Sequence, residues 1–537
     1  MSFYRLALPV VPLFLAALAV NACGDDDNAA PKADASVPFE TGASETSTPV
    51  DSGNDVDTGP GACTPASFAW ATPGAGALTD AVNGVALDTD GSVWVTGSFI
   101  GDTTWGAFPL TGVDKTHPTS FVAKLDAKGT VLFAKALGGD HLQFNDSGGQ
   151  RVRLDADGNA YVVGSYLGEL KIGTTVDLLQ NNAGGADAAY IVKLDKDGNA
   201  LWGLTTANDG GSAEAGFDVA IDANGDVYFA GSFDGRVKFV NTPDGGIDDI
   251  DPLPSGGTSV EGAFLAKYSQ TTKKWLWAKS WTGGNDSGGT ALGIALTADG
   301  VTVVGTITTA ISIDGTILSA ASGSFVVKTA KSDGHVLWAT QIANGSASTL
   351  ARVAAVTADG ANNVYLTGSF TGTATLESAA VVLDAGSDDA GAGSLKITVT
   401  GTGTDMLVAK YDANGAPGWV KHAGVGDLTT RGSDVAFDGA SGLYIAGFKQ
   451  GTPSFDAQTL THTGDLFVAR YDTSGAIQWV TANDSASTGS GDGRGIAVRS
   501  STSGVIAGGF FNATSTFGSV SLTSAGSDDG VVTRLCN

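Results

Sequence analysis

The chain has 537 residues, with 56 acidic against 29 basic residues and a formal net charge of −27. This acidic balance argues against a nucleic-acid-binding protein and against direct docking on anionic lipid, because both surfaces would repel the chain. It fits a soluble, self-repelling protein.

The amino-terminal segment, residues 1–22, has the pattern of a secretory signal peptide. Arg5 supplies the positive charge, and residues 6–20 form an apolar stretch of the length that such signals use. This stretch is shorter than the roughly 20 apolar residues that a membrane-spanning helix needs. Residues 20–23 (VNAC) resemble a bacterial lipobox, in which the cysteine is lipidated. We expect a lipid anchor on Cys23, and the alternative is an ordinary secretory signal followed by an unrelated cysteine.

The following segment, residues 24–62, is rich in Asp, Ser, Thr and Pro. It contains one basic residue, Lys32, and one aromatic residue, Phe39. Such a composition buries too little apolar surface to offset the entropy of ordering, so we expect a disordered acidic linker over 23–62 that includes the lipidated cysteine. The globular part is expected to extend over 63–537.

A short strand pattern carrying a glycine recurs through this globular part. Its best examples are VWVTGSF from Val93 and VYFAGSF from Val227. Apolar runs of this length, bounded by turn residues, are typical of strands buried on both faces. A repeat every 60 to 80 residues, roughly, predicts radially repeated β-sheets. Seven glycines mark the repeats: Gly97, Gly164, Gly231, Gly305, Gly368, Gly447 and Gly508.

Two further strands complete each repeat. One ends in a basic residue, and a tight turn then leads to an outer strand with an aromatic residue. The basic residues are Lys124, Lys193, Lys267, Lys328, Lys410, Arg470 and Arg534. The aromatic residues are Trp70, Phe133, Trp202, Trp277, Trp338, Trp419 and Trp479. A small-residue strand, such as 218–222 (DVAID), begins the repeat. We also expect the surplus residues from Leu170 to form an extra hairpin.

The two ends of the chain hold incomplete repeats. The strand around Trp70 has no partner before it, and the strand around Arg534 has no outer strand after it. Together they complete one repeat. The sequence therefore predicts an all-β, single seven-bladed β-propeller whose amino-terminal and carboxy-terminal strands pair to close the ring, which removes open sheet edges.

This pattern, IAVDxxGxxYVTGSF followed by DxFVAKYDxxGxxxW, resembles the bacterial SBBP-type β-propeller-repeat family. The resemblance extends from Ser67 to the carboxy terminus. It implies a propeller fold and no particular activity, because the family is defined by its repeat.

The register of the repeats also predicts a disulfide between Cys63 and Cys536. Cys536 follows Arg534 by two residues, as Asp472 follows Arg470, and Cys63 precedes Trp70 by seven residues, as Asp472 precedes Trp479. Both cysteines thus occupy the same turn position, and an oxidising cell envelope would permit the bond.

No motif in the sequence predicts catalysis. The five histidines show no metal-ligand spacing, and no serine nucleophile or phosphate loop is evident. Turns such as Asp88-Thr89-Asp90-Gly91 leave Ca²⁺ binding open, but the position of the bidentate Glu is occupied by Phe99. Asp and Gly are also the residues that hairpin turns require, so we expect no metal site and no cofactor.

Variable loops are expected on one face and short turns on the other. The longest variable loop is expected from Glu377 to Thr404. Loops on a rigid scaffold commonly carry binding sites. Four Asn-Asp pairs in such loops are candidate binding residues, with ordinary solvated loops as the alternative: Asn145 and Asp146, Asn208 and Asp209, Asn285 and Asp286, Asn483 and Asp484.

These features favour a monomeric binding scaffold on the bacterial outer membrane, held by a lipid anchor. A protein or glycan is the expected partner. Two alternatives stay open, a glycan hydrolase or lyase with carboxylates across the central opening, and a factor for envelope or outer-membrane assembly. An enzyme should show clustered carboxylates with raised pKa values at the channel mouth.

Overall fold

The computed structural model describes residues 64–113, 115–138, 147–172, 176–180, 186–208, 213–240, 253–254, 261–283, 288–308, 310–314, 316–318, 323–344, 351–381, 395–485 and 491–537. All regular elements in these ranges are β-strands, which confirms the all-β prediction. The described residues include no helix that is long and apolar enough to cross a membrane. The predicted signal peptide, linker, Cys23 and Cys63 lie outside the described residues.

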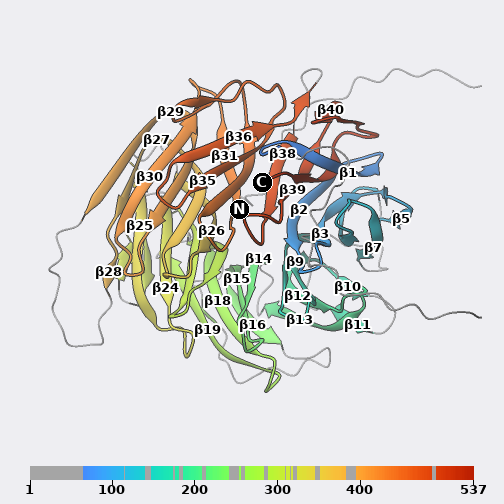
Figure 1. Cartoon of the computed structure of the whole chain (residues 1–537). Helices are drawn as coiled ribbons and strands as arrows, with labels where there is room; N and C mark the ends of the chain where they lie inside the picture. Colours follow the sequence, from blue (N-terminus) through green and yellow to red (C-terminus); the bar gives the residue numbers. More distant parts are fainter. Residues whose placement is uncertain are drawn as a thin grey trace, which may run out of the picture. The chain divides into compact units, whose positions relative to one another are not determined.

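The described chain is built from four-stranded antiparallel units (Figure 1). We number the units in chain order, and we call the first strand of each its inner strand and the fourth its outer strand. Unit 1 contains β2 (Asp80–Leu87), β3 (Val93–Ile100), β6 (Pro118–Leu125) and β7 (Val131–Leu137); unit 2 contains β8 (Ser147–Leu154), β9 (Ala160–Tyr166), β12 (Ala188–Leu194) and β13 (Ala200–Asn208). Unit 3 contains β14 (Glu214–Ile221), β15 (Val227–Asp234), β18 (Glu261–Ser269) and β19 (Lys274–Gly283); unit 4 contains β20 (Gly289–Leu296), β21 (Val301–Ile307), β24 (Gly323–Thr329) and β25 (Val336–Asn344).

The remaining units follow the same order. Unit 5 contains β26 (Ala351–Ala358), β27 (Val364–Glu377), β29 (Lys396–Tyr411) and β30 (Pro417–Gly424); unit 6 contains β31 (Thr430–Phe437), β32 (Gly442–Lys449), β35 (Leu466–Asp472) and β36 (Ile477–Ala482). Unit 7 contains β38 (Gly491–Ala497), β39 (Val505–Phe511), β42 (Asp529–Leu535) and β1 (Phe68–Gly76). Its outer strand is therefore the first strand of the chain, and Trp70 pairs with Arg534.

The recurring glycine of the second strand lies where two strands approach closely. A Cβ atom at Gly231 would lie 1.9 Å from the Ala215 carbonyl oxygen and 2.7 Å from the ring of Phe264. In unit 7 the same approach falls on Gly509, where a Cβ atom would lie 1.8 Å from the Asp492 carbonyl oxygen. The sequence prediction of Gly508 at this place was wrong by one residue, because turn aspartates that mark the register elsewhere are missing from this repeat.

Short hairpins inserted between the second and third strands link neighbouring units. The hairpin predicted from Leu170 is confirmed as the antiparallel pair β10 (Glu169–Ile172) and β11 (Val176–Gln180). Other inserted strands pair with the preceding unit: β4 (Asp102–Trp105) with β1, β16 (Arg236–Val240) with β13, β22 (Ile311–Ile313) with β19, and β33 (Ser454–Phe455) with β30. Their second strands are β5 (Phe108–Thr111), β17 (Leu253–Pro254), β23 (Thr316–Leu318) and β34 (Gln458–Thr459). In unit 7, β40 (Thr514–Phe517) pairs with β41 (Val520–Thr523) and with β37 (Asp484–Ser485), which follows β36.

The insertion of unit 5 differs from the prediction. The sequence suggested a loop from Glu377 to Thr404, but β27 continues to Glu377 and β29 begins at Lys396, so both flanks are strands. Leu376 is fully buried and pairs with Ile342 of the preceding unit, while β28 (Ala380–Val381) also pairs with β25. Removing all of 377–404 would therefore cut a strand pairing as well as a loop.

Adjacent units are joined at the turn between the third and outer strands. In unit 5 the Ala413 carbonyl oxygen accepts two hydrogen bonds from unit 4, from Trp338 Nε1 at 3.0 Å and from Lys328 Nζ at 3.3 Å. In unit 4 the Lys331 carbonyl oxygen accepts the equivalent two hydrogen bonds from unit 3, from Trp277 Nε1 at 3.4 Å and from Lys267 Nζ at 3.2 Å. At these two junctions the aromatic and the basic residue therefore bond to the same carbonyl group of the next unit.

The junction between units 7 and 1 repeats this arrangement. The Ala127 carbonyl oxygen accepts Trp70 Nε1 at 3.1 Å and Arg534 NH1 at 2.9 Å. The turn glycine that follows, Gly129, has φ +85°, and a Cβ atom there would lie 2.7 Å from the Trp70 ring. The glycine is therefore required both by its backbone conformation and by the packed indole.

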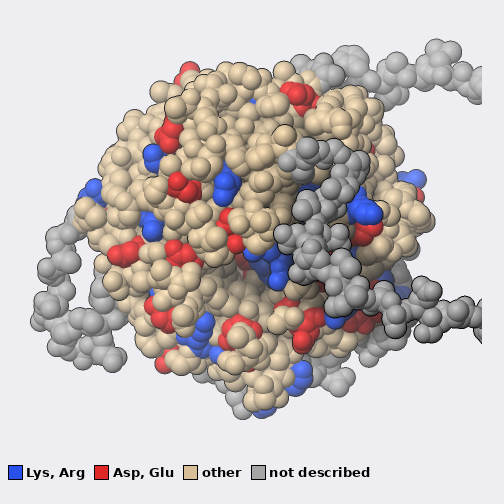
Figure 2. All heavy atoms as spheres, viewed as in Figure 1, with Lys and Arg blue, Asp and Glu red and all other residues tan. Residues whose placement is uncertain are grey.

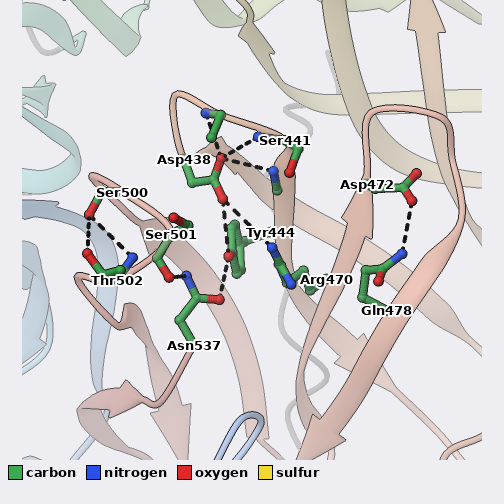
Figure 3. A network of polar contacts seen from close by, with 12 residues as sticks. Asp438, Ser441, Tyr444, Arg470, Asp472, Gln478, Ser500, Ser501, Thr502 and Asn537 are labelled. Carbon is green, nitrogen blue, oxygen red and sulfur yellow. Dashed lines mark hydrogen bonds and ion pairs between the residues drawn. The ribbon is translucent and has the colours of Figure 1, made fainter.

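The corresponding turn of unit 7 is formed by two segments that are far apart in the sequence, residues 64–67 and 536–537. The Cys536 N–H donates to the Ser67 carbonyl at 2.9 Å, and the Ala66 N–H donates to the Cys536 carbonyl at 3.1 Å. These bonds match those between Asp472, Gly475 and Ala476 in unit 6. Figure 3 shows how Asn537 is held here: its Nδ2 donates to the Ser501 carbonyl, and its Oδ1 accepts from Tyr444.

Trp419 and Trp479, at equivalent positions of units 5 and 6, provide a matched pair of variants. Trp419 Nε1 donates to the Thr473 carbonyl at 3.1 Å, whereas the buried Nε1 of Trp479 has no hydrogen-bond partner within the described residues. Trp419→Phe should lower the free energy of unfolding by about 1 kcal/mol more than Trp479→Phe, because only the first loses a hydrogen bond. Urea unfolding of both variants tests this, and equal losses would contradict it.

The predicted disulfide also has a clear test. Cys536 is buried and bonded through its backbone to residues three and four positions after Cys63. Peptide mapping without reduction should recover the two cysteines linked, and Cys536→Ser should lower the stability by about 2–5 kcal/mol. Recovery of both as free thiols from air-exposed folded protein would refute the pairing.

Candidate functional site at the inner edge

The inner strands lie side by side in chain order, and β38 of unit 7 lies against β2 of unit 1. Each inner strand contains a register shift opposite its second strand, such as that between Val82 and Gly84 in β2 or between Gly432 and Asp434 in β31. Because an inner strand is the edge of its sheet, its unpaired backbone groups need other partners. Side chains of neighbouring units supply several of them.

Two aspartates bond to the inner strand of the following unit. Asp218 Oδ2 accepts the Ile294 N–H at 3.0 Å, and Asp434 Oδ2 accepts the Ile496 N–H at 3.0 Å. Asn83 Nδ2 donates to the Gly149 carbonyl at 2.8 Å. These contacts fasten the inner edges of consecutive units and fix the positions of the acidic groups.

Arg151 of unit 2 connects units 1, 6 and 7. Its NH1 lies 3.2 Å from Asp434 Oδ2, and it donates to the carbonyl oxygens of Asn83 at 3.3 Å and Arg494 at 3.2 Å. The Arg151 side chain is 9% exposed. A buried ion pair of this kind costs desolvation, which the additional carbonyl contacts offset. Similarly, Arg153 NH2 lies 3.2 Å from Asp218 Oδ1.

Arginine is concentrated on the inner strands. Five of the ten arginines of the chain lie there, and no lysine does: Arg151, Arg153, Arg352, Arg431 and Arg494. Figure 2 shows basic side chains gathered near the centre of the drawn face, where β14 and β26 lie in Figure 1, with acidic side chains beside them. The sequence prediction missed this set. The signal that would have found it is the choice of Arg over Lys on these strands, since the planar guanidinium suits fixed ion pairs.

The described members of the predicted Asn-Asp pairs, Asn208, Asn483 and Asp484, do not lie on the inner strands. Asn145, Asp146, Asp209, Asn285 and Asp286 lie outside the described residues. The backbone of Asn208 ends β13 and pairs with Val237 of β16.

The remaining pair, Asn483 and Asp484, forms hydrogen bonds with backbone groups of unit 6. Asn483 is 1% exposed, and its Oδ1 accepts the Leu466 N–H at 3.1 Å. Asp484 accepts the Thr463 N–H at 3.1 Å and contacts His462 Nδ1 at 3.2 Å. Burial opposes the lowered pKa of Asp484, and these two hydrogen bonds produce it. Both side chains are thus committed to local contacts.

The aspartate-rich turns also use their carboxylates internally. Asp155 Oδ1 accepts the N–H groups of Asp157 and Asn159, and its Oδ2 lies 3.0 Å from Lys193 Nζ. Burial tends to raise the Asp155 pKa, but the Asn159 and Lys193 contacts dominate and lower it. Within the described residues, no group of three His, Cys, Asp or Glu side chains could hold a metal ion.

Carboxyl groups with raised pKa values lie at the junctions between units. Burial raises the pKa of Asp80, the first residue of β2, to about 7; the charge of Asp529 adds to this, and the hydrogen bond from Thr103 opposes it. Burial raises the pKa of Glu214, the first residue of β14, to about 9. Asp80 Oδ1, Asp529 Oδ1 and Glu214 Oε1 have no hydrogen-bond partner in the described part of the chain.

A recess of 410 Å³ lies on the face of the short turns. Its lining includes Asp88, Thr89, Leu154, Asp155 and Arg499. It is on the opposite side from the variable loops that the sequence favours for binding. Because Asp155 is already bonded within its turn, Arg499 is the main charged group that this recess offers.

Comparisons with known proteins identify no family. No family model matches the sequence. The chain is 27% identical over 217 residues to an uncharacterized WD repeat-containing protein of Acanthamoeba polyphaga mimivirus, and the match covers 37% of this chain and 15% of that protein. The chain thus spans only a small part of the relative.

Two solved structures are similar at low identity. One is a catalytically inactive virginiamycin B lyase from Staphylococcus aureus with quinupristin, at TM-score 0.31 and 13% identity, covering 70% of this chain and 95% of that one. The other is an ulvan lyase of polysaccharide lyase family PL25, at TM-score 0.38 and 10% identity, covering 83% and 92%.

The raised pKa of Asp80 predicts a pH dependence of stability. The folded state retains a proton between the usual aspartate pKa, about 4, and pH 7, where the unfolded state has lost it, so stability should fall as pH rises through this window. The slope should be up to about 1.4 kcal/mol per pH unit. Asp80→Asn should flatten this slope. The control variant Asp102→Asn, at an exposed position of β4, should leave the slope unchanged. Urea unfolding between pH 4 and 8 measures both, and an unchanged slope in Asp80→Asn would contradict the assignment.

Proposed function

We propose that the chain is a closed seven-bladed β-propeller that acts as a binding scaffold on the bacterial cell envelope, anchored by a lipid on Cys23. Each four-stranded unit would be one blade. The proposal of closure is supported by the junction of units 7 and 1, where Trp70 and Arg534 bond to the Ala127 carbonyl as their counterparts do at other junctions. Radial repetition of such sheets leaves only short, protected edges.

The arginine-rich inner edge is the observation that carries the binding role. Arg431 NH2 lies 2.8 Å from Asp492 Oδ2, and Arg494 Nε lies 3.5 Å from the same oxygen. The Arg431 side chain is nevertheless 40% exposed. Charged groups that are held in place and still accessible recognise a ligand without a large ordering cost. We therefore assign ligand binding to the end of the inner edge where Arg352 and Arg431 lie.

The alternative of a glycan hydrolase or lyase receives less support. Its carboxylates should converge at the mouth with raised pKa values. The two carboxyl groups with the largest rise in pKa, Asp80 and Glu214, are each 1% exposed and begin the inner strands of units 1 and 3. Burial also raises the pKa values of Asp234, Asp465, Asp528 and Asp529. Burial at a blade junction favours a structural role for Asp80 and Glu214.

The proposal is tested by blocking this end of the inner edge. Ala215 occupies in β14 the place that Arg352 occupies in β26, since each pairs with the serine after the recurring glycine. Ligands of the purified full chain, found by glycan-array screening, should lose at least tenfold in affinity with Ala215→Trp. Ala156→Trp, in the recess on the opposite face, serves as the control.

Equal affinity in wild type and Ala215→Trp would refute the proposed site. Cleavage of a bound glycan, detected as new chain ends or unsaturated products, would favour the enzyme alternative instead. Melting curves of both variants ensure that any loss of affinity is not a loss of folding.

A further inference from the structure

The inner strands share one register position at which the side chains of units 1 to 3 differ in size and charge from those of units 5 to 7. The residues that hold this position, each opposite the residue after the recurring glycine, are Ala81, Gly148, Ala215, Thr290, Arg352, Arg431 and Asp492. Units 1 to 3 contribute only small residues, and units 5 to 7 contribute long or charged ones. Small side chains on one half leave space beside the arginines on the other.

Arg352 is the most available cation of this set. Its side chain is exposed and donates no hydrogen bond to any residue in the described ranges. Its pKa is lowered, first because the surrounding protein displaces water and then because the positive charge of Arg431 is close; Glu261 acts in the opposite direction. A cation that is accessible, confined and repelled by another cation is favourable for binding an anion.

The neighbouring arginines are held more rigidly. Arg431 stacks over the Phe448 ring at 4.4 Å, and Arg494 stacks over the Phe510 ring at 4.7 Å. Both also contact Asp492, which is 5% exposed and lies beneath them. Stacking and the buried carboxylate fix the guanidinium planes while leaving donor groups on Arg431 for a ligand.

The acidic groups near these arginines are already engaged. Glu261 Oε1 accepts the Thr290 hydroxyl at 2.7 Å, and Asp492 Oδ2 accepts both neighbouring arginines. Asp528 accepts Asn512 Nδ2 at 3.2 Å. Arg352 therefore has no committed carboxylate partner among the described residues.

We propose that Arg352 and Arg431 form an oxyanion subsite, which binds a carboxylate or sulfate group of an acidic ligand. This deepens the proposed function and depends on it. Two adjacent guanidinium groups match the two oxygens of a carboxylate or sulfate, and Arg431 keeps its orientation through Asp492. The small residues of units 1 to 3 leave room for the rest of the ligand.

The test uses the purified full chain and four probes: citrate, inorganic sulfate, polygalacturonate and a neutral glucan of similar length. Isothermal titration calorimetry at 50 mM and 200 mM salt should detect binding of at least one anionic probe, weakened at the higher salt because the contact is electrostatic. Arg352→Gln and Arg431→Gln should each reduce affinity at least tenfold. Arg236→Gln, on the exposed start of β16, should change it less than twofold.

The probes separate the sources of the anion. Tighter binding of polygalacturonate than of citrate would indicate a carboxylated polymer, and preference for sulfate would indicate a sulfated ligand. Equal losses in Arg236→Gln and Arg352→Gln, or no binding of any anionic probe at millimolar concentration, would overturn the inference. Binding of the neutral glucan that Ala215→Trp abolishes and Arg352→Gln preserves would overturn it while leaving the proposed function intact.

Discussion

At three junctions between units in the described chain, the fold depends on one carbonyl group in the turn between a third and an outer strand. That oxygen accepts both the tryptophan N–H and the basic side chain of the preceding unit, as Ala413 does from Trp338 and Lys328. Two residues about ten positions apart in the sequence are thereby tied to one atom of the next repeat. This shared contact ties neighbouring units together and accounts for the pairing of Trp with Lys or Arg at these three junctions.

The inner edge poses a separate requirement, because the inner strand of each unit pairs with the second strand on one side only and leaves its other side unpaired. Asp218 and Asp434 meet it by accepting backbone N–H groups of the following unit. Arg151 then balances Asp434 and bonds to two backbone carbonyl groups. The guanidinium of Arg352 is exposed and has no hydrogen-bond partner among the described residues, and the proposed ligand site rests on this difference from Arg151.

Much of the fold could be predicted from the sequence because it repeats. Strand order, the turn aspartates and the hairpin at β10 and β11 follow from local patterns, whereas the binding candidates came only from loop composition. Asn483, one of these candidates, is instead buried and accepts the backbone N–H of Leu466. The arginines of the inner strands were missed because their contacts join residues that are distant in the sequence. Arg151 and Asp434, for example, are 283 positions apart. Similarly, the insertion of unit 5 resembled a loop by composition, and only the pairing of β27 with β25 and with β29 shows that its flanks are strands.

The proposed closure depends on the pairing of β1 with β42 within unit 7, which brings together segments from opposite ends of the described chain. Native-state hydrogen exchange followed by mass spectrometry measures this directly. Amides of β1 (Phe68–Gly76) and β42 (Asp529–Leu535) should exchange as slowly as those of β24 and β25 in unit 4. Complete exchange of β1 within seconds, while β24 stays protected, would contradict closure of the fold by the two ends of the chain.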